Sequence, residues 1–402
     1  MPQKIPFLSK HLNTHLNNDH SHLIEVCSQC EGKSHSGESS RLVVRFPSDF
    51  SNLMKRLALL SLIPALCSPL FADEAADIIS QSGVRGGIVV HVGCGDATVT
   101  QALKANDSYQ VQGLTKDAEA VPALREKIHA AGNYGPVAIE SWAGGTLPYI
   151  ENYVNLLVIE DAALVAKEEI DRVLVPLGVA MVRKAGGWEK IIKPWPTGMD
   201  EWTHYAYDSK GNPTSKDYLV GPPTRMQWVG NPRWSRHHDR MSSVSAEVSS
   251  GGRLYYILDE GSRISILMPA KFMLEARDAF NGTVLWKKAI PEWSTHLWPL
   301  KSGPTQLTRR LVSIGDKVYV TLGITAPISC LDGATGKVIR EYPETAGTEE
   351  ILIRNGTIYA MVNQEPWRLN DEFAVKQQSD QKRVETEFNW DGKKRNLLAI
   401  DE

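Results

Sequence analysis

The chain has little excess of charge of either sign. Its 402 residues include 44 Lys and Arg against 47 Asp and Glu, a formal net charge of -3, and no basic stripe runs through the sequence. Nucleic acids and acidic membranes select basic surfaces, so we expect neither as a partner. The partner is otherwise open, with a cell-envelope protein and a small-molecule ligand as the two alternatives. With 42% hydrophobic residues, the composition is that of a soluble globular protein of two or three domains.

Cysteine is also scarce, with five in the chain. Cys27 and Cys30 lie near several histidines, but a structural zinc site normally needs a second ligand pair at a defined spacing, and none follows. The favoured alternative is that translation starts at Met54 and that residues 1–53 are a non-structural extension. Cys94 and Cys330 are then the cysteines of the folded part, and their place in separate domains argues against a disulfide framework.

The apolar run near the N-terminus is too short to span a bilayer. It follows Met54-Lys55-Arg56, covers residues 57–66 and leads to a small residue, Ala72, just before Asp73. A basic start, a short apolar core and a small residue at the cut are the parts of a secretory signal peptide. We therefore expect residues 54–72 to be removed and the protein to be exported to the periplasm or cell envelope.

Residues 73–192 alternate between strand and helix patterns, which predicts a mainly parallel sheet with helices on both faces. The expected strands cover residues 88–92, 109–115, 137–141, 155–159 and 179–182, and the expected helices cover 98–105 and 167–174.

The turn Gly93-Cys94-Gly95-Asp96 after the first strand, together with residues 172–178 before the fifth, resembles a class I S-adenosylmethionine-dependent methyltransferase. The resemblance implies S-adenosylmethionine as cofactor. It places Gly93, Gly95 and Asp96 in the loop that approaches the cofactor, and Asp117 near the ribose position.

The same segment departs from that family at its carboxylates. His91 occupies the acidic position of the first motif, Ala97 replaces its third glycine, Thr115 stands where a ribose-binding carboxylate usually ends the second strand, and Ala143 replaces an acid on the adenine side. Each lost charged hydrogen bond is worth about 1.5 to 3 kcal/mol. A structural relic of the fold is therefore favoured, and an active methyltransferase stays open.

The C-terminal part repeats a strand–turn–strand phrase, at 276–286 and again at 330–340, and begins it once more at 355–362 and 397–402. A period of about 40 to 55 residues with several short strands is typical of a β-propeller. The turns Asn281-Gly282 and Thr335-Gly336 place glycine where a hairpin needs positive φ, and the preceding Asp can bond the turn backbone. We expect Trp286 to wedge against the neighbouring blade; Arg340 holds that position in the second copy.

These copies resemble the quinoprotein (PQQ-like) repeat A-x-D-x-x-T-G-x-x-x-W of quinoprotein alcohol dehydrogenases and of propeller lipoproteins in outer-membrane assembly. The whole arrangement is similar to exported bacterial proteins of planctomycete type that join a degenerate methyltransferase-like domain to such a propeller. The resemblance makes PQQ a conceivable cofactor, and about two blades cannot close a ring, so we expect further blades beyond Glu402.

A connector, residues 193–247, is rich in Trp and Pro, which predicts a segment packed across the domain boundary. It contains His204, His237, His238 and Asp239, which are suitable in type for a metal or acid–base site. The alternative, which is favoured, is that they close the seam between domains through hydrogen bonds.

The predicted organisation is multidomain, an α/β Rossmann-like domain followed by an incomplete all-β propeller. Its segments are an extension at 1–53, a signal peptide at 54–72, a methyltransferase-like domain at 73–192, a connector at 193–247 and PQQ-like blades at 248–402. Three functions stay open: an exported binding or scaffolding module, which is favoured, a periplasmic quinoprotein-like oxidoreductase, or an S-adenosylmethionine-dependent methyltransferase.

Overall fold

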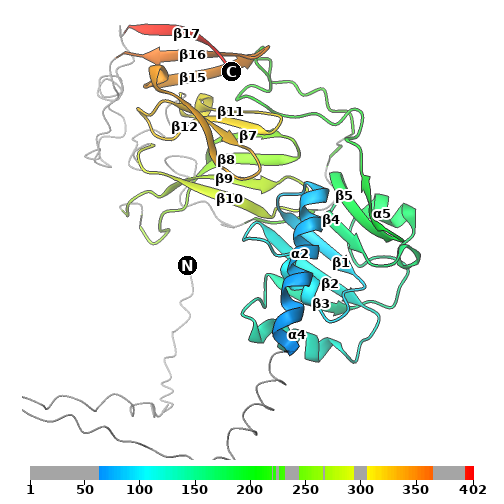
Figure 1. Ribbon diagram of the computed structural model, residues 1–402. Coiled ribbons are helices and arrows are strands. Elements are labelled where there is room, and N and C mark those ends of the chain that lie inside the picture. Colours follow the sequence, from blue (N-terminus) through cyan, green and yellow to red (C-terminus); the bar gives the residue numbers. More distant parts are fainter. Residues whose placement is uncertain are drawn as a thin grey trace, which may run out of the picture. The chain divides into compact units, whose positions relative to one another are not determined.

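The computed structural model describes residues 63–219, 221–222, 226–230, 244–265, 268–293, 306–364 and 394–402, with side chains from Asp73 onward (Figure 1). The predicted extension 1–53 and residues 54–62 of the predicted signal peptide lie outside this range. Helix α2, Ile63–Ser82, runs across the predicted cleavage point before Asp73. In the described part of the chain, no helix is both long and apolar enough to cross a membrane.

The α/β region contains one six-stranded sheet in the order β3-β2-β1-β4-β5-β6. Its neighbours pair in parallel from β3 through β5, and β6 pairs antiparallel with β5 at the edge. The strands are β1 Gly87–Val92, β2 Tyr109–Thr115, β3 Val137–Ser141, β4 Val154–Ile159, β5 Leu174–Lys184 and β6 Gly187–Ile192. This order is the doubly wound order of Rossmann-like α/β folds, so the predicted Rossmann-like class of this region is confirmed.

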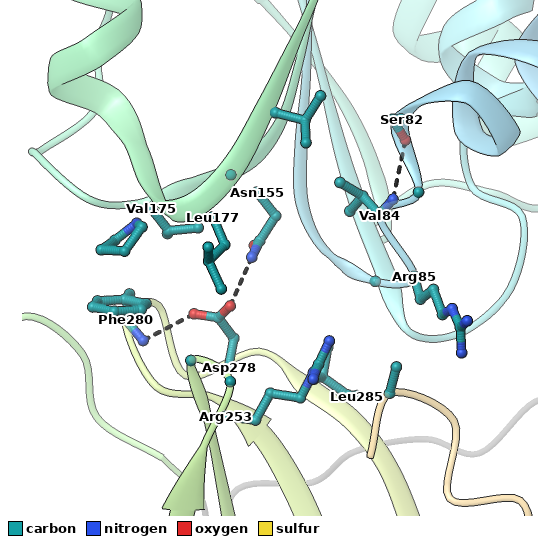
Figure 2. A pocket seen from close by; sticks show the side chains of 18 of the residues that line it. Ser82, Val84, Arg85, Asn155, Val175, Leu177, Arg253, Asp278, Phe280 and Leu285 are labelled. Carbon is teal, nitrogen blue, oxygen red and sulfur yellow. Dashed lines mark hydrogen bonds between the residues drawn. The ribbon is translucent and has the colours of Figure 1, made fainter. Parts of the chain in front are cut away.

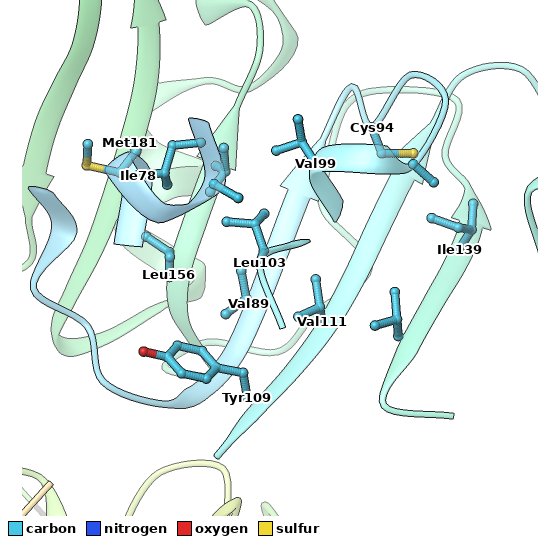
Figure 3. Packing of buried hydrophobic residues seen from close by; sticks show 14 of the residues in the cluster. Ile78, Val89, Cys94, Val99, Leu103, Tyr109, Val111, Ile139, Leu156 and Met181 are labelled. Carbon is cyan, nitrogen blue, oxygen red and sulfur yellow. The ribbon is translucent and has the colours of Figure 1, made fainter. Parts of the chain in front are cut away.

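Apolar side chains cover both faces of the sheet, as a parallel sheet between helices requires. The remaining helical elements are α3 Thr98–Ala102, α4 Val121–Ala130, η1 Ala162–Leu164 and α5 Lys167–Val173. One core cluster joins Ile78 of α2 and Leu103 to Val89 and Leu156 (Figure 3), and the cluster on the other face joins Ile170 to Val90. The domain therefore has its own two-sided core.

The sequence misplaced the start of β5. Residues 174–178 were expected to be the end of a helix and a loop, but β5 begins at Leu174. A residue that precedes proline is pushed away from helical angles, so Val175 before Pro176 favours extension. The exposed edge strand β6 and helix α4 were also not predicted.

The C-terminal part forms three antiparallel sheets of consecutive strands. The first contains β7 Val244–Ser250, β8 Arg253–Asp259, β9 Phe272–Asp278 and β10 Val284–Ile290; the second contains β11 Leu311–Ile314, β12 Lys317–Thr321, β13 Ile328–Asp332 and β14 Val338–Tyr342; the third contains β15 Thr348–Arg354, β16 Thr357–Asn363 and β17 Arg395–Asp401. Short helices η2, Leu307–Arg310, and η3, Pro343–Thr345, flank the second sheet. One core cluster joins the first two sheets and another joins the second and third. Within the described residues these sheets form no closed ring, so the all-β part is confirmed and the propeller stays a prediction.

The repeated turns have the chemistry that the sequence predicted. The Oδ1 atom of Asp278 accepts hydrogen bonds from the amides of Phe280 and Asn281, each at 2.9 Å, and Asp332 does the same in the next copy. Gly282 and Gly336 have φ of 74° and 67°.

Trp286 wedges against the next sheet, as predicted. Its Nε1 donates to the carbonyl of Gly333 at 2.9 Å, and a Cβ on Gly336 would lie 2.6 Å from its ring. Trp228 of the connector repeats this contact on the first sheet, with Nε1 donating to Ala279 at 3.1 Å and a Cβ on Gly282 meeting its ring at 2.4 Å. The connector thus takes the position that a tryptophan of a preceding repeat would hold.

The described parts of the connector pack across the boundary, as their Trp and Pro content predicted. The Trp202 carbonyl accepts from the Ser249 amide of β7, and the Trp202 amide donates to Ser249 Oγ. The Thr203 carbonyl accepts from the Ser313 amide of β11. Gln227 donates to the carbonyls of both Asn152 and Phe280, which belong to the α/β region and the first β-sheet.

Candidate functional site

The loop between β1 and α3 lies at the carboxyl ends of the parallel strands, where open α/β sheets bind ligands. Gly93 and Gly95 both have positive φ, 86° and 52°. A Cβ on Gly93 would lie 3.1 Å from the Cβ of Glu160, whereas no heavy atom lies within 4 Å of that position on Gly95. Of the two glycines, only Gly95 borders open space.

Asp96, the third predicted loop residue, is engaged within the protein. Its carboxylate accepts hydrogen bonds from the Thr98 amide at 3.0 Å and from Lys127 Nζ at 2.9 Å. Burial acts to raise the pKa of Asp96, but these hydrogen bonds outweigh it and lower that pKa to about 2. Asp96 therefore stays ionised as the partner of Lys127.

Asp117 follows β2, which pairs with β1, so it lies at the same edge of the sheet as Gly93, Gly95 and Asp96. Its Oδ1 accepts from the amides of Glu119 and Ala120, at 3.0 and 3.2 Å, which caps the turn into α4. The structure thus brings the four predicted residues to one edge and gives Asp96 and Asp117 partners there.

A partly buried network of hydrogen bonds and ion pairs that the sequence did not predict crosses this edge. His91 Nε2 donates to Glu160 at 2.9 Å, and Arg183 Nε donates to the other oxygen of Glu160 at 2.7 Å. Arg183 also pairs with Glu74 of α2 and lies 4.1 Å from the Trp188 ring centroid.

The network holds Glu160 in its ionised form. Burial acts to raise its pKa, but the hydrogen bonds and charges of His91 and Arg183 lower it below its usual range. The sequence contains one signal of this network, which is a His inside the otherwise apolar strand β1. A buried imidazole ring needs polar partners, so some polar side chains had to lie beside it.

His204, predicted as a metal or acid–base residue, is a buried hydrogen-bonding side chain. Its Nε2 accepts from the Ile353 amide at 3.1 Å, and its Nδ1 lies 2.8 Å from Thr203 Oγ1. Burial lowers its pKa to about 4, so the ring is neutral near pH 7. Both nitrogens are used inside the fold, as the hydrogen-bonding alternative expects.

The other predicted members of that site, His237, His238 and Asp239, lie outside the described residues. The metal prediction as a whole therefore stays a prediction. Across the described ranges, no group of three or more His, Cys, Asp or Glu side chains is placed to hold a metal ion. Cys94 and Cys330 are buried free thiols.

A cavity of about 320 Å³ lies at the opposite edge of the α/β sheet, where that sheet meets the turns of the first two β-sheets (Figure 2). Asn155 is the centre of the polar contacts beside it. Its Nδ2 donates to Asp278 Oδ2 at 2.7 Å, and its Oδ1 accepts from the Ile88 amide and from Asn281 Nδ2. Burial of Asp278 raises its pKa.

No protein-family model matches the chain, and no curated protein matches it. Among solved structures, it is similar to a candidate S-adenosyl-L-methionine-dependent methyltransferase from Methanococcus maripaludis, with 18% identity and a TM-score of 0.27 over 36% of this chain and 67% of that one. It is also similar to a geranyl diphosphate C-methyltransferase from Streptomyces coelicolor, with 15% identity and a TM-score of 0.26 over 27% of this chain and 44% of that one. A third match is the [4+2]-cyclase SpnF, with 22% identity and a TM-score of 0.26 over 29% of this chain and 47% of that one. This chain spans less than half of the last two proteins, and at such identities and scores the fold assignment rests on the strand order.

Proposed function

We propose that this protein is an exported binding or scaffolding protein, in which a methyltransferase-like domain without methyl transfer is joined to PQQ-like β-blades. The observation that carries the proposal is the ionic network of His91, Glu160, Arg183 and Glu74 at the carboxyl edge of the α/β sheet. The side chains of this network already bind one another, so they leave few unpaired polar groups for a cofactor.

The ribose position supports the same conclusion. Thr115 replaces the carboxylate that ends the second strand in the family, and its Oγ1 already accepts from the Asp117 amide at 3.1 Å. A ribose hydroxyl would lose a charged acceptor there, at a cost of about 1.5 to 3 kcal/mol.

The repeated Trp contacts support the blade part of the proposal. Trp286 and Trp228 join successive units by the same hydrogen bond and the same ring-on-glycine packing. Stacked units of this kind present extended surfaces suited to protein partners. Quinone oxidation stays an expectation from the repeat alone.

An S-adenosylmethionine-dependent methyltransferase is the second candidate, because one observation favours it. Gly95 borders open space at the carboxyl edge of β1, next to Asp96 and on the same edge as Asp117. A cofactor could approach the backbone there.

Calorimetry of the exported chain with S-adenosylmethionine and S-adenosylhomocysteine distinguishes the two candidates. We expect no heat of binding at millimolar ligand. A matched pair of variants tests any binding that appears: Gly95→Ala alters the loop, and Gly132→Ala is the control, since Gly132 also has positive φ, 72°, and open space around it. Micromolar binding that Gly95→Ala abolishes and Gly132→Ala retains would overturn the non-catalytic proposal.

A further inference from the structure

The seam cavity, the space of about 320 Å³ described above, has one wall from each part of the fold. The α/β wall comes from the segment 82–86 before β1, from Asn155 and from the start of β5. The β-sheet wall comes from the turns at 251–253, 278–280 and 316. The volume is at the lower end of the range found for small-molecule pockets.

Two guanidinium groups line this cavity. Arg253 donates to Asp316 Oδ1 at 2.7 Å, and Arg85 donates to Asp332 Oδ2 at 2.7 Å. The Arg253 side chain is 21% exposed, whereas that of Asp316 is 81% exposed. The cation is thus fixed at the cavity while its counter-ion is largely in water.

Because the Asp316 carboxylate is largely in water, solvent screens its attraction to Arg253 and this pair contributes little. An incoming anion can therefore replace Asp316 beside Arg253 at small cost. Asp278, the other carboxylate at the cavity, also attracts Arg253 electrostatically, but its oxygens already accept hydrogen bonds from Asn155 and two turn amides.

Much of the remaining lining is apolar. Val175 and Leu177 of β5 line the cavity from the α/β side, and Phe280 and Leu285 line it from the first β-sheet (Figure 2). A ligand that leaves water here gains from apolar burial as well as from charge.

We propose that the seam cavity binds a small organic anion with an apolar body, such as an aromatic carboxylate or sulfonate, with Arg253 as the main counter-ion. The inference is independent of the proposed function, because it uses neither the carboxyl edge of the α/β sheet nor the outer surfaces of the blades.

The test uses 1-anilinonaphthalene-8-sulfonate, which combines a sulfonate with an aromatic body, in a titration followed by fluorescence and by calorimetry. We expect one saturable site per chain. Arg253→Gln should weaken binding about tenfold or more, the loss expected for a charged hydrogen bond. Asp316→Asn should strengthen it by up to about fivefold, because it removes the competing carboxylate.

Arg309→Gln is the matched control, since Arg309 also forms a surface pair, with Glu350 at 3.0 Å, and does not line the cavity. Its affinity should equal that of the unmodified chain. Absence of a saturable site, equal affinity of Arg253→Gln and Arg309→Gln, or weaker binding by Asp316→Asn would each overturn the proposal. Asp316 is so exposed that its variant should fold, which keeps the test decisive if Arg253→Gln does not.

Discussion

Replacement of Asn155 by Ala should destabilise the protein more than any surface change, because this one amide joins the α/β sheet to the first β-sheet. Its Oδ1 accepts from the Ile88 amide at 2.8 Å and from Asn281 Nδ2 at 2.7 Å, and its Nδ2 donates to Asp278 at 2.7 Å. The side chain is buried, so water does not readily replace these partners.

The magnitude follows from what the substitution leaves behind. The Ile88 amide loses its acceptor, which costs about 1 to 3 kcal/mol for a buried group, and Asp278 loses one charged hydrogen bond, worth about 1.5 to 3 kcal/mol. Asn281 loses less, because its Nδ2 also donates to the Tyr153 carbonyl at 2.9 Å. The free energy of unfolding should therefore fall by about 3 to 5 kcal/mol.

Denaturant unfolding followed by tryptophan fluorescence measures this loss. The control is Asn212→Ala, at an exposed asparagine whose side chain bonds only locally to Thr214, and it should change the free energy of unfolding by less than about 0.5 kcal/mol. A double-mutant cycle with Asp278→Ala should give a coupling energy of about 1 to 3 kcal/mol, since the two side chains share a hydrogen bond. A loss below about 1 kcal/mol for Asn155→Ala, or additive losses in the cycle, would refute the argument.

Two further predictions concern single residues. Ala97→Gly should change the free energy of unfolding by less than about 0.5 kcal/mol, because relief of its φ of 63° is offset by the loss of a fully buried methyl group. Ala123→Gly in the exposed face of α4 should lower the free energy of unfolding by about 0.5 to 1 kcal/mol, and denaturant midpoints compare the two variants. His204 has a pKa of about 4 in the folded protein against 6.5 in the unfolded chain, so the unfolded chain binds the proton first as the pH falls. The contribution of His204 to the free energy of unfolding is therefore complete above pH 6.5. It is lost as the pH falls towards 4, by up to about 1.4 kcal/mol per pH unit. His204→Gln should flatten that part of the pH–stability curve, and an unchanged slope would contradict this assignment.

Most strands of the α/β region could be predicted from the local pattern of apolar residues. The strands at 109–115 and 137–141 were predicted to the residue, because their buried side chains, such as Tyr109, Val111, Val137 and Ile139, recur at every second position, as in a strand. The edge strand β6 was missed because its residues are mostly exposed and carry no such pattern. The turn chemistry of Asp278 and Asp332 was predictable because it is local in sequence.

The candidate sites were predicted less well, because their contacts are long-range. The sequence placed His91 at an unusual position, but nothing in it indicated that Glu160 would meet this ring or that Arg183 of β5 would bind the other oxygen of Glu160. The same holds for Asn155 and Asp278, which are 123 residues apart. Pairing of this kind is decided by how the sheets pack, which local patterns do not encode.

Trp228 gives the array of β-sheets a defined starting end. Stacked units gain stability from their interfaces with neighbours, so a terminal unit without a cap is the first to fray. Trp228 packs on Gly282 and so covers the end of the first antiparallel sheet. The preceding residue, Gln227, donates to the Asn152 carbonyl, which ties this covering residue to the α/β core. Cooperativity can then pass from the α/β core into the antiparallel sheets through Gln227 and Trp228, in addition to the contacts of Asn155. The α/β domain would then serve these sheets as the nucleus from which their order propagates.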